Sequence, residues 1–377
     1  EDAVQGSFGF VGHLEIRPTR WFSLVFEPRL RIDFTESGRH RVIPDIGYAE
    51  FAEGPVEVRA GLQRFHWGKS NISRPTDPLG PVDQGIGFFR ADRLGELALS
   101  TRLMFDPVTI DVVWNPIFRH PLYPAGSNAV GVDFGPLGSL QLGLREGWLT
   151  EDISVENMTF AARVGATFGP VDLEAMWMSG PSRLPGPLLD NLTLKDVVYP
   201  VDIVGASVAW AIDPVILRGE FAWISSGRAP IVINAAEPFP WTEPIPADYA
   251  AFTVGAELAL YDFIGESDLI VIVEYMGEIR PHRDAQATFR PWQNDLALLL
   301  NWSLDDLDET RVSAGAIVDL AHADTVLSLS ASRHLIADIV LSIDAVLLLE
   351  GNDDEPLRIT HSLADRDSVV GRLTWSF

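Results

Sequence analysis

The sequence predicts an all-β protein, a transmembrane antiparallel up-and-down β-barrel of about 16–20 strands with 18 as the preferred number. Three observations predict this fold: apolar and polar residues alternate along many segments, tight turns alternate with long connections, and the chain ends in an alternating strand. At about 20 residues per strand and connection, 377 residues fit about 18 strands. We therefore expect residues 1–377 to form a single barrel domain.

Alternation with a period of two is clear near both ends of the chain. Phe22, Leu24 and Phe26 share one parity, and residues 339–349 alternate between apolar positions and a face that carries Asp344. The alternation persists for about ten residues, whereas a strand of a soluble sandwich averages about five or six. A tilted strand needs about ten residues to cross a hydrocarbon layer, so the lengths favour a transmembrane barrel.

The connections alternate between two kinds, as a barrel with two different sides requires. Tight turns carry a proline at Pro55, Pro107, Pro170 and Pro214, where no ladder hydrogen bond is needed. We assign the tight turns to the periplasm and the long connections to the outside. The expected long outer loops lie near residues 64–93, 115–127, 179–199, 226–248, 280–290 and 351–366.

The last strand carries the most specific local signal. Leu373, Trp375 and Phe377 alternate up to the terminal residue. This ending resembles the terminal strand by which Gram-negative outer-membrane proteins are recognised for barrel assembly. The resemblance implies a location in the bacterial outer membrane, with membrane lipid, lipopolysaccharide and the barrel-assembly machinery as partners. The chain opens without a basic and apolar leader, so we expect that a secretion signal has been removed.

Composition excludes several other classes of protein. A chain that is 47% hydrophobic and 21% charged is too apolar to be disordered. The longest purely apolar runs, such as 269–273, are far shorter than the roughly 20 residues of a transmembrane helix. The absence of cysteine excludes disulfides and thiolate metal sites. A net charge of −25 argues against nucleic acid as a partner.

The polar parity of a barrel this wide lines an aqueous path, and its charge is uneven. Basic residues outnumber acidic ones between Arg17 and Arg93, whereas the rest of the chain is strongly acidic. We expect the loop from Lys69 to Arg93 to fold inward and, with the basic wall beside it, to set the selectivity of a pore. The predicted pore-lining and selectivity residues are Arg29, Arg31, Arg59, Gln63, Arg64, His66, Lys69, Asp77 and Asp83.

Two arrangements of this basic region are open from the sequence. The cationic side chains can form one cluster, with Asp77 and Asp83 of the loop opposite. Alternatively, the arginines pair with acidic residues of their own wall, namely Glu27, Asp33 and Glu57.

Two stretches resemble a pattern of proteobacterial outer-membrane barrels that are largely uncharacterised. In that pattern a strand ends in a Trp-Gly pair, a loop with Pro-x-Asp follows, and a later strand ends in a Pro-x-Phe run. The matching residues are Arg64 to Ser70, Pro75 to Leu79, Val113 to Phe118 and Leu122 to Ser127. The resemblance implies a porin-like barrel and no particular solute.

Catalysis has little support in the sequence, and we expect no enzyme activity and no cofactor. Ser332 lies near His334 and Ser362 follows His361, but no nucleophile elbow or metal-binding histidine motif is present. Carboxylate pairs at 305–306 and 353–354 lie in turns or loops, where they could hold Ca²⁺ or Mg²⁺ loosely.

The function that we expect is passive diffusion of small hydrophilic solutes through an outer-membrane channel. The alternative is a plugged barrel that acts as a surface-binding or polysaccharide and protein assembly scaffold. A third alternative, a barrel that moves apolar molecules, requires an apolar lumen or a lateral gap. A homo-oligomer or a partner protein is compatible with each alternative.

Overall fold

The structure is a computed structural model of the chain. It describes residues 6–34, 40–83, 92–119, 121, 157–183, 186–190, 193–197, 200–226, 248–280, 293–336, 338–349, 351 and 367–376. These residues contain no helix that is long and apolar enough to span a membrane.

The strands are β1 (Ser7–Val11), β2 (Leu14–Thr19), β3 (Phe22–Asp33), β4 (Arg41–Glu53), β5 (Val56–Gln63), β6 (Val82–Asp83), β7 (Asp92–Arg93), β8 (Glu96–Phe105), β9 (Val108–Asn115), β10 (Thr159–Phe168), β11 (Val171–Pro181), β12 (Gly186–Asp190), β13 (Thr193–Val197), β14 (Pro200–Ile212), β15 (Val215–Ser226), β16 (Tyr249–Ile264), β17 (Ser267–Ile279), β18 (Asn294–Ser303), β19 (Arg311–Asp319), β20 (Thr325–Ile336), β21 (Ile339–Leu349) and β22 (Ser368–Trp375).

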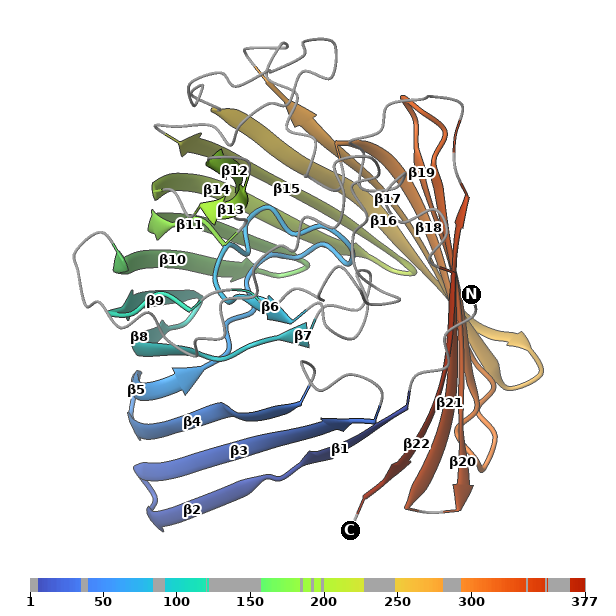
Figure 1. Cartoon of the computed structure of the whole chain (residues 1–377), viewed down its shortest axis with the longest axis horizontal. Helices are drawn as coiled ribbons and strands as arrows, with labels where there is room; N and C mark the ends of the chain where they lie inside the picture. The colour runs from blue at the N-terminus through green and yellow to red at the C-terminus, as the bar shows by residue number, and fades with distance from the viewer. Residues whose placement is uncertain are drawn as a thin grey trace.

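Eighteen of these strands form one curved antiparallel sheet that encloses a central space (Figure 1). Consecutive strands of this sheet pair with each other, which is the up-and-down order that the alternating pattern predicts. β1 and β2 both pair with β3, so they are two halves of one strand that is interrupted at Gly12 and His13. The predicted all-β barrel is therefore confirmed. β6 with β7 and β12 with β13 form two small separate ladders.

The two faces of the sheet differ in the way that the alternation predicts. On β15, Phe221 and Trp223 point outward and are exposed, whereas Glu220, Ala222 and Ile224 point inward and are buried. The same contrast holds along most strands, and the outer surface is a band of exposed aliphatic and aromatic side chains. Such a surface is stable against lipid and costly in water.

The predicted tight turns lie on one side of the barrel. Gly54-Pro55 joins β4 to β5, and the turns at Pro107, Pro170 and Pro214 join β8 to β9, β10 to β11 and β14 to β15. Gly54 takes a positive φ of 58°, which glycine adopts at little cost. The strand ends that the long connections join lie on the opposite side. Residues 128–145, where the Gly135-Pro136 step suggests a further hairpin, fall outside the described residues.

The sheet has two edges in the described part of the chain, since no ladder there joins β22 to β1 or β2. β1 and β2 are exposed at every position and β22 at six of its eight positions, unlike most strands between them. Because every ladder is antiparallel and the order is consecutive, β22 runs in the same direction as β1 and β2.

The assignment of the outer face to lipid can be tested on β18, whose Leu298 is exposed outward while Asn301 points inward. We expect Leu298→Arg to lower the free energy of unfolding in phospholipid vesicles by about 2–4 kcal/mol, because a charge then enters hydrocarbon. The matched variant Asn301→Arg should change the free energy by less than about 1 kcal/mol, because its charge meets water. Equal losses in urea titrations of both variants would contradict the assignment.

Candidate functional site

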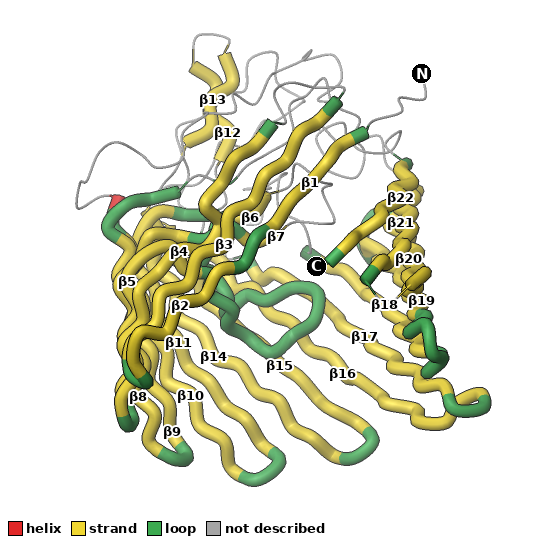
Figure 2. Tube along the Cα trace, turned by 90° about the horizontal axis from the view of Figure 1, so that it is seen from below, coloured by secondary structure: helices red, strands yellow, loops and turns green. Residues whose placement is uncertain are grey.

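The connection from β5 towards β8 turns into the barrel instead of leaving it. We call residues 64–83 the inner loop; Figure 2 shows its middle part in green, enclosed by the strands. The inner loop passes over the inner face of the wall as far as β17, where its tip is bound. The enclosed space is therefore divided, with the inner loop on the side of β8 to β17.

Glu220 of β15 is the first anchor of the inner loop. Its carboxylate is buried and accepts four hydrogen bonds from the loop: from the main-chain N–H groups of Lys69 and Ser70 at 2.6 Å each, and from the N–H and hydroxyl of Thr76 at 3.1 and 2.7 Å. Hydrogen bonds to a charged acceptor are stronger than neutral ones. They compensate for the removal of the carboxylate from water.

Glu274 of β17 is the second anchor and is only 1% exposed. It accepts hydrogen bonds from the N–H groups of Asn71 and Ile72 at 2.6 and 2.9 Å and from the Asn71 side chain at 3.1 Å. Between the two anchoring strands, the Thr253 hydroxyl of β16 donates to the Ser73 carbonyl at 3.0 Å. Three adjacent strands thus hold both limbs of the inner loop by its main chain.

Gly68 permits the close approach of the loop to the first anchor. It has a φ of 81°, and a Cβ there would lie 2.8 Å from a carboxylate oxygen of Glu220. Gly205 of β14 makes room in the same way, because a Cβ there would lie 2.9 Å from the Thr76 methyl group. Only glycine fits at these two contacts.

An apolar cluster fills the space between the inner loop and the wall. Phe65, Trp67 and Leu79 of the loop are buried against inward-facing residues of seven strands. The wall residues of this cluster are Ala98, Val113, Ala161, Met176, Met178, Val201, Ile203, Ala222, Ile224, Tyr249 and Ala251. The expectation that inward positions line an aqueous path is therefore wrong for this part of the wall, because the loop covers it.

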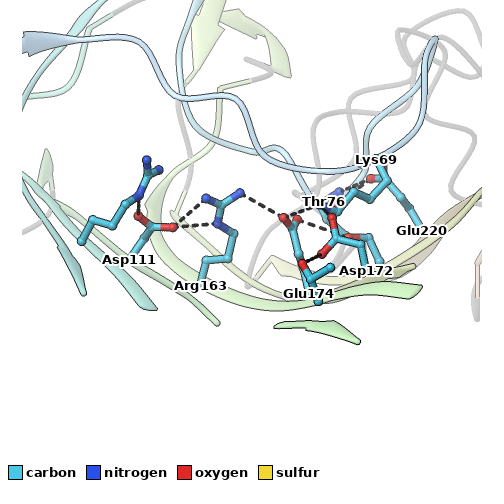
Figure 3. A network of polar contacts seen from close by, with 10 residues as sticks. Lys69, Thr76, Asp111, Arg163, Asp172, Glu174 and Glu220 are labelled. Carbon is cyan, nitrogen blue, oxygen red and sulfur yellow. Dashed lines mark hydrogen bonds and ion pairs between the residues drawn. The ribbon is translucent and has the colours of Figure 1, made fainter. Parts of the chain in front are cut away.

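A row of alternating charges crosses the wall beside this cluster (Figure 3). Asp111 of β9 lies between Arg102 of β8 and Arg163 of β10, at 2.7 and 2.6 Å. Arg163 also contacts Glu174 of β11 at 3.2 Å, and its guanidinium lies over the Trp67 ring at 5.3 Å from the centroid. Lys69 of the loop completes the row, with its Nζ atom 2.7 Å from Glu174.

Glu96 of β8 ties the base of the inner loop to two other connections. It is fully buried and lies 2.6 Å from Arg183, which follows β11. It also accepts hydrogen bonds from the Asn115 amide at 2.7 Å and from the Gly80 N–H at 3.2 Å. One carboxylate thereby fixes the loop and the ends of β9 and β11.

The structure divides the predicted cationic cluster into separate ion pairs. Arg29 and Arg64 share the buried carboxylate of Asp45, and Arg29 also pairs with Asp92 at 2.7 Å. Arg59 lies apart from them and pairs with Glu50 and Glu57 at 2.7 and 3.1 Å. Pairing within the wall was the alternative left open by the sequence. The predicted partner Glu57 is confirmed for Arg59. The sequence did not predict Asp45 and Glu50 as partners of these arginines.

The remaining predicted residues take different roles. Lys69 is paired across the inner wall with Asp172 at 2.6 Å. Asp77 does not face the wall arginines; it is buried and pairs with Arg93 at 2.8 Å. Asp83 is also buried, in the short ladder of β6 with β7. Gln63 is buried and bonds to the Ala98 carbonyl at 2.9 Å, so it is a structural residue of the wall.

Arg31 and His66 complete the predicted set. Arg31 is half-buried on β3, two residues from Arg29, and it takes part in an interaction of its own. His66 is exposed on the inner loop between two buried aromatic residues. The sequence reasoning missed Glu220, Glu274, Glu174, Arg163 and Arg74 as parts of this site.

The predicted assembly signal and the predicted carboxylate pairs lie only partly within the described residues. Leu373 and Trp375 are exposed on β22, and Phe377 lies outside the described residues. Asp306 belongs to the turn between β18 and β19 and accepts bonds from the N–H and hydroxyl of Thr310 at 2.6 and 2.7 Å, which is a structural role. The carboxylate pair at 353–354 and residues 361–362 lie outside the described residues. Among the described residues, no group of three histidine, aspartate or glutamate side chains could hold a metal ion.

Comparisons with known proteins identify the class by fold. No family model matches the chain, and no curated protein matches it by sequence. Among solved structures, the Escherichia coli outer-membrane protein Wzi, described as a carbohydrate-binding β-barrel involved in capsule assembly, matches with a TM-score of 0.52 at 11% identity, covering 92% of this chain and 75% of that one. Pseudomonas aeruginosa OccK8 (OprE) matches with a TM-score of 0.48 at 10% identity, covering 92% and 88%. Salmonella typhi OmpF matches with 0.45 at 12%, covering 99% and 90%.

The fold is that of Gram-negative outer-membrane β-barrels, and the predicted class and location agree with these neighbours. At about one identical residue in ten, the likeness concerns the fold alone.

The anchoring of the inner loop can be tested with Glu220→Gln, which removes one of the two acceptor oxygens. We expect amide hydrogen exchange at Ser70 and Thr76 to accelerate roughly tenfold or more, because charge-assisted hydrogen bonds are lost. Glu257→Gln is the matched control: Glu257 also lies on the inner wall but pairs with Arg218 of β15. Unchanged exchange in the first variant would show that the anchor is dispensable.

Asp77 of the inner loop makes the free energy of unfolding depend on pH. Burial raises the pKa of Asp77 to about 6 from 3.8, although Arg93 opposes the shift. Between about pH 4 and 6 the folded protein holds a proton that the unfolded chain releases, so the stability contributed by Asp77 falls as pH rises. We expect the unfolding free energy of the wild type, relative to Asp77→Asn, to fall by roughly 3 kcal/mol between pH 4 and 7. A difference that is independent of pH would contradict this assignment.

Proposed function

We propose that this barrel is a passive channel for small hydrophilic solutes, narrowed by the inner loop. The solutes pass between the free side of the loop and the wall of β18 to β22. The observation that carries the proposal is the contrast between the two halves of the inner wall. One half is dry beneath the loop, and the other carries hydroxyl and amide groups that solvent reaches.

The wall of β18 to β21 supports this path. The ladder registers place Asn301, Ser313 and Ser330 in one row on the inward face, and all three are partly exposed. Asp344 of β21 ends this row and is buried. A neighbouring row carries Ser303, Arg311, Ser332 and Ser342 in the same order of strands. Side chains of this kind exchange hydrogen bonds with water and with polar solutes without binding them tightly, which conduction requires.

A second candidate is a plugged barrel that serves as a surface-binding or assembly scaffold. The dry contact between the inner loop and the wall favours it, because the loop fills that part of the interior. The fold also resembles Wzi, whose structure is described as that of a carbohydrate-binding barrel. The two candidates differ in whether water and ions cross the folded protein.

Planar-bilayer recordings separate the two candidates. We expect the wild type to give discrete ohmic current steps. In Glu220→Gln/Glu274→Gln the open current should become noisier, because a released loop moves into the path, whereas Glu257→Gln should resemble the wild type. Silence of a folded, inserted wild-type barrel would overturn the channel and favour the scaffold.

A further inference from the structure

The large sheet leaves two strand edges without a neighbour in the described part of the chain. β22 forms one border of the sheet, and β1 with β2 forms the other (Figure 1). The strands between these borders already pair on both sides, so no described strand of the sheet is available to either edge. We call the two free edges together the seam.

The seam exposes main-chain groups at the depth of the membrane. Each border presents a row of N–H and C=O groups that its own sheet does not pair. Such groups are strongly unfavourable in hydrocarbon, where no water can bind them, and open sheet edges are not stable there. The seam therefore requires a further source of hydrogen bonds.

Strand direction decides what can fill the seam. Since β22 runs in the same direction as β1 and β2, direct pairing of the two borders would be parallel. A strand inserted between them runs antiparallel to both and forms the more stable kind of ladder on each side. A second copy of this chain in the same orientation does not supply such a strand, because its described free edges have this same direction.

The side chains beside the seam specify the pattern of the inserted strand. On the outer face, Phe8, Leu14 and Val369 are 54%, 53% and 74% exposed. The opposite parity is polar: His13 binds Glu27 of β3 at 2.7 Å, and Arg372 lies opposite Ser342 of β21. A strand in the seam therefore alternates apolar side chains that meet lipid with polar side chains that meet the interior.

From these edges we propose that the seam binds an extended segment of a second, different polypeptide as an added strand, antiparallel to both borders. The segment is about ten residues long, which is the length that crosses the hydrocarbon layer. Its main-chain hydrogen bonds supply the affinity, and the alternation of its side chains supplies the selectivity. The inference does not depend on conduction, because a plugged barrel has the same two edges.

Amide hydrogen exchange of the wild-type barrel in detergent micelles tests this proposal. The probe is a synthetic peptide with the sequence of β21, which pairs antiparallel with β22, flanked by lysines for solubility. We expect the peptide to slow exchange in β1, β2 and β22 roughly tenfold or more, because their edge amides gain partners. The amides of β18, which has two neighbours, should be unchanged, and a shuffled peptide without alternation should have no effect.

Disulfide formation locates the bound peptide, and a chain without cysteine needs only a single substitution. Val369→Cys on β22 should form a disulfide with peptides in which one outward residue is cysteine. The yield should be roughly tenfold above that of Leu298→Cys on β18, because a disulfide requires Cα atoms within about 7 Å. Both side chains are exposed outward, but only β22 has a free edge.

Three outcomes would overturn the proposal. Equal effects of the alternating and the shuffled peptide would show that the seam does not recognise a strand. Slow exchange of the edge amides without peptide would show that the seam is already filled, by direct pairing or by another part of this chain. A disulfide between Phe8→Cys and Val369→Cys in one barrel would show direct contact of the borders, since an inserted strand separates them by about 10 Å.

Discussion

The arrangement of the interior depends on the hydrogen bonds that two buried carboxylates accept from the main chain of the inner loop. Glu220 and Glu274 stand on strands far along the chain from the loop that they hold. A carboxylate in a dry site is costly unless several donors surround it. The loop supplies these donors, and the carboxylates supply acceptors for N–H groups that would otherwise be buried without partners.

The charges of the wall obey the same constraint. Asp111, Arg163 and Glu174 alternate across neighbouring strands, so each charge has opposite neighbours on both sides. Lys69 extends this order from the wall to the loop. An arginine-rich wall therefore does not produce a broad positive surface, because its charges are largely neutralised within the wall. In the proposed channel, the charge that a solute meets would depend on the few groups left outside these pairs.

The sequence predicted the sheet well and the interior only in part. Alternation identifies which residues of a strand share a face, and the proline turns mark where strands end, so both follow from local pattern. Local pattern does not show which distant carboxylate accepts a hydrogen bond from a given main-chain N–H group. Glu220, for example, accepts from Ser70, which lies 150 residues away in the sequence. Small inward-facing residues such as Ala98, Ala161 and Ala222 could have indicated that a loop covers this part of the wall. Side chains this short leave room for a chain segment to pack against the inner face. The ion pairs of Asp45 with Arg29 and Arg64 required the registers of β4 with β3 and with β5, which the sequence does not specify.

Glu220 binds the inner loop mostly through main-chain N–H groups. The position of the loop therefore depends little on which side chains it carries. Exchange of the residues at 66 and 74 leaves every bond to Glu220 and Glu274 in place. One scaffold can therefore present many different chemical surfaces at the same point of its interior. Natural divergence or laboratory selection could alter what the barrel recognises through a handful of codons, without a new fold and without loss of assembly.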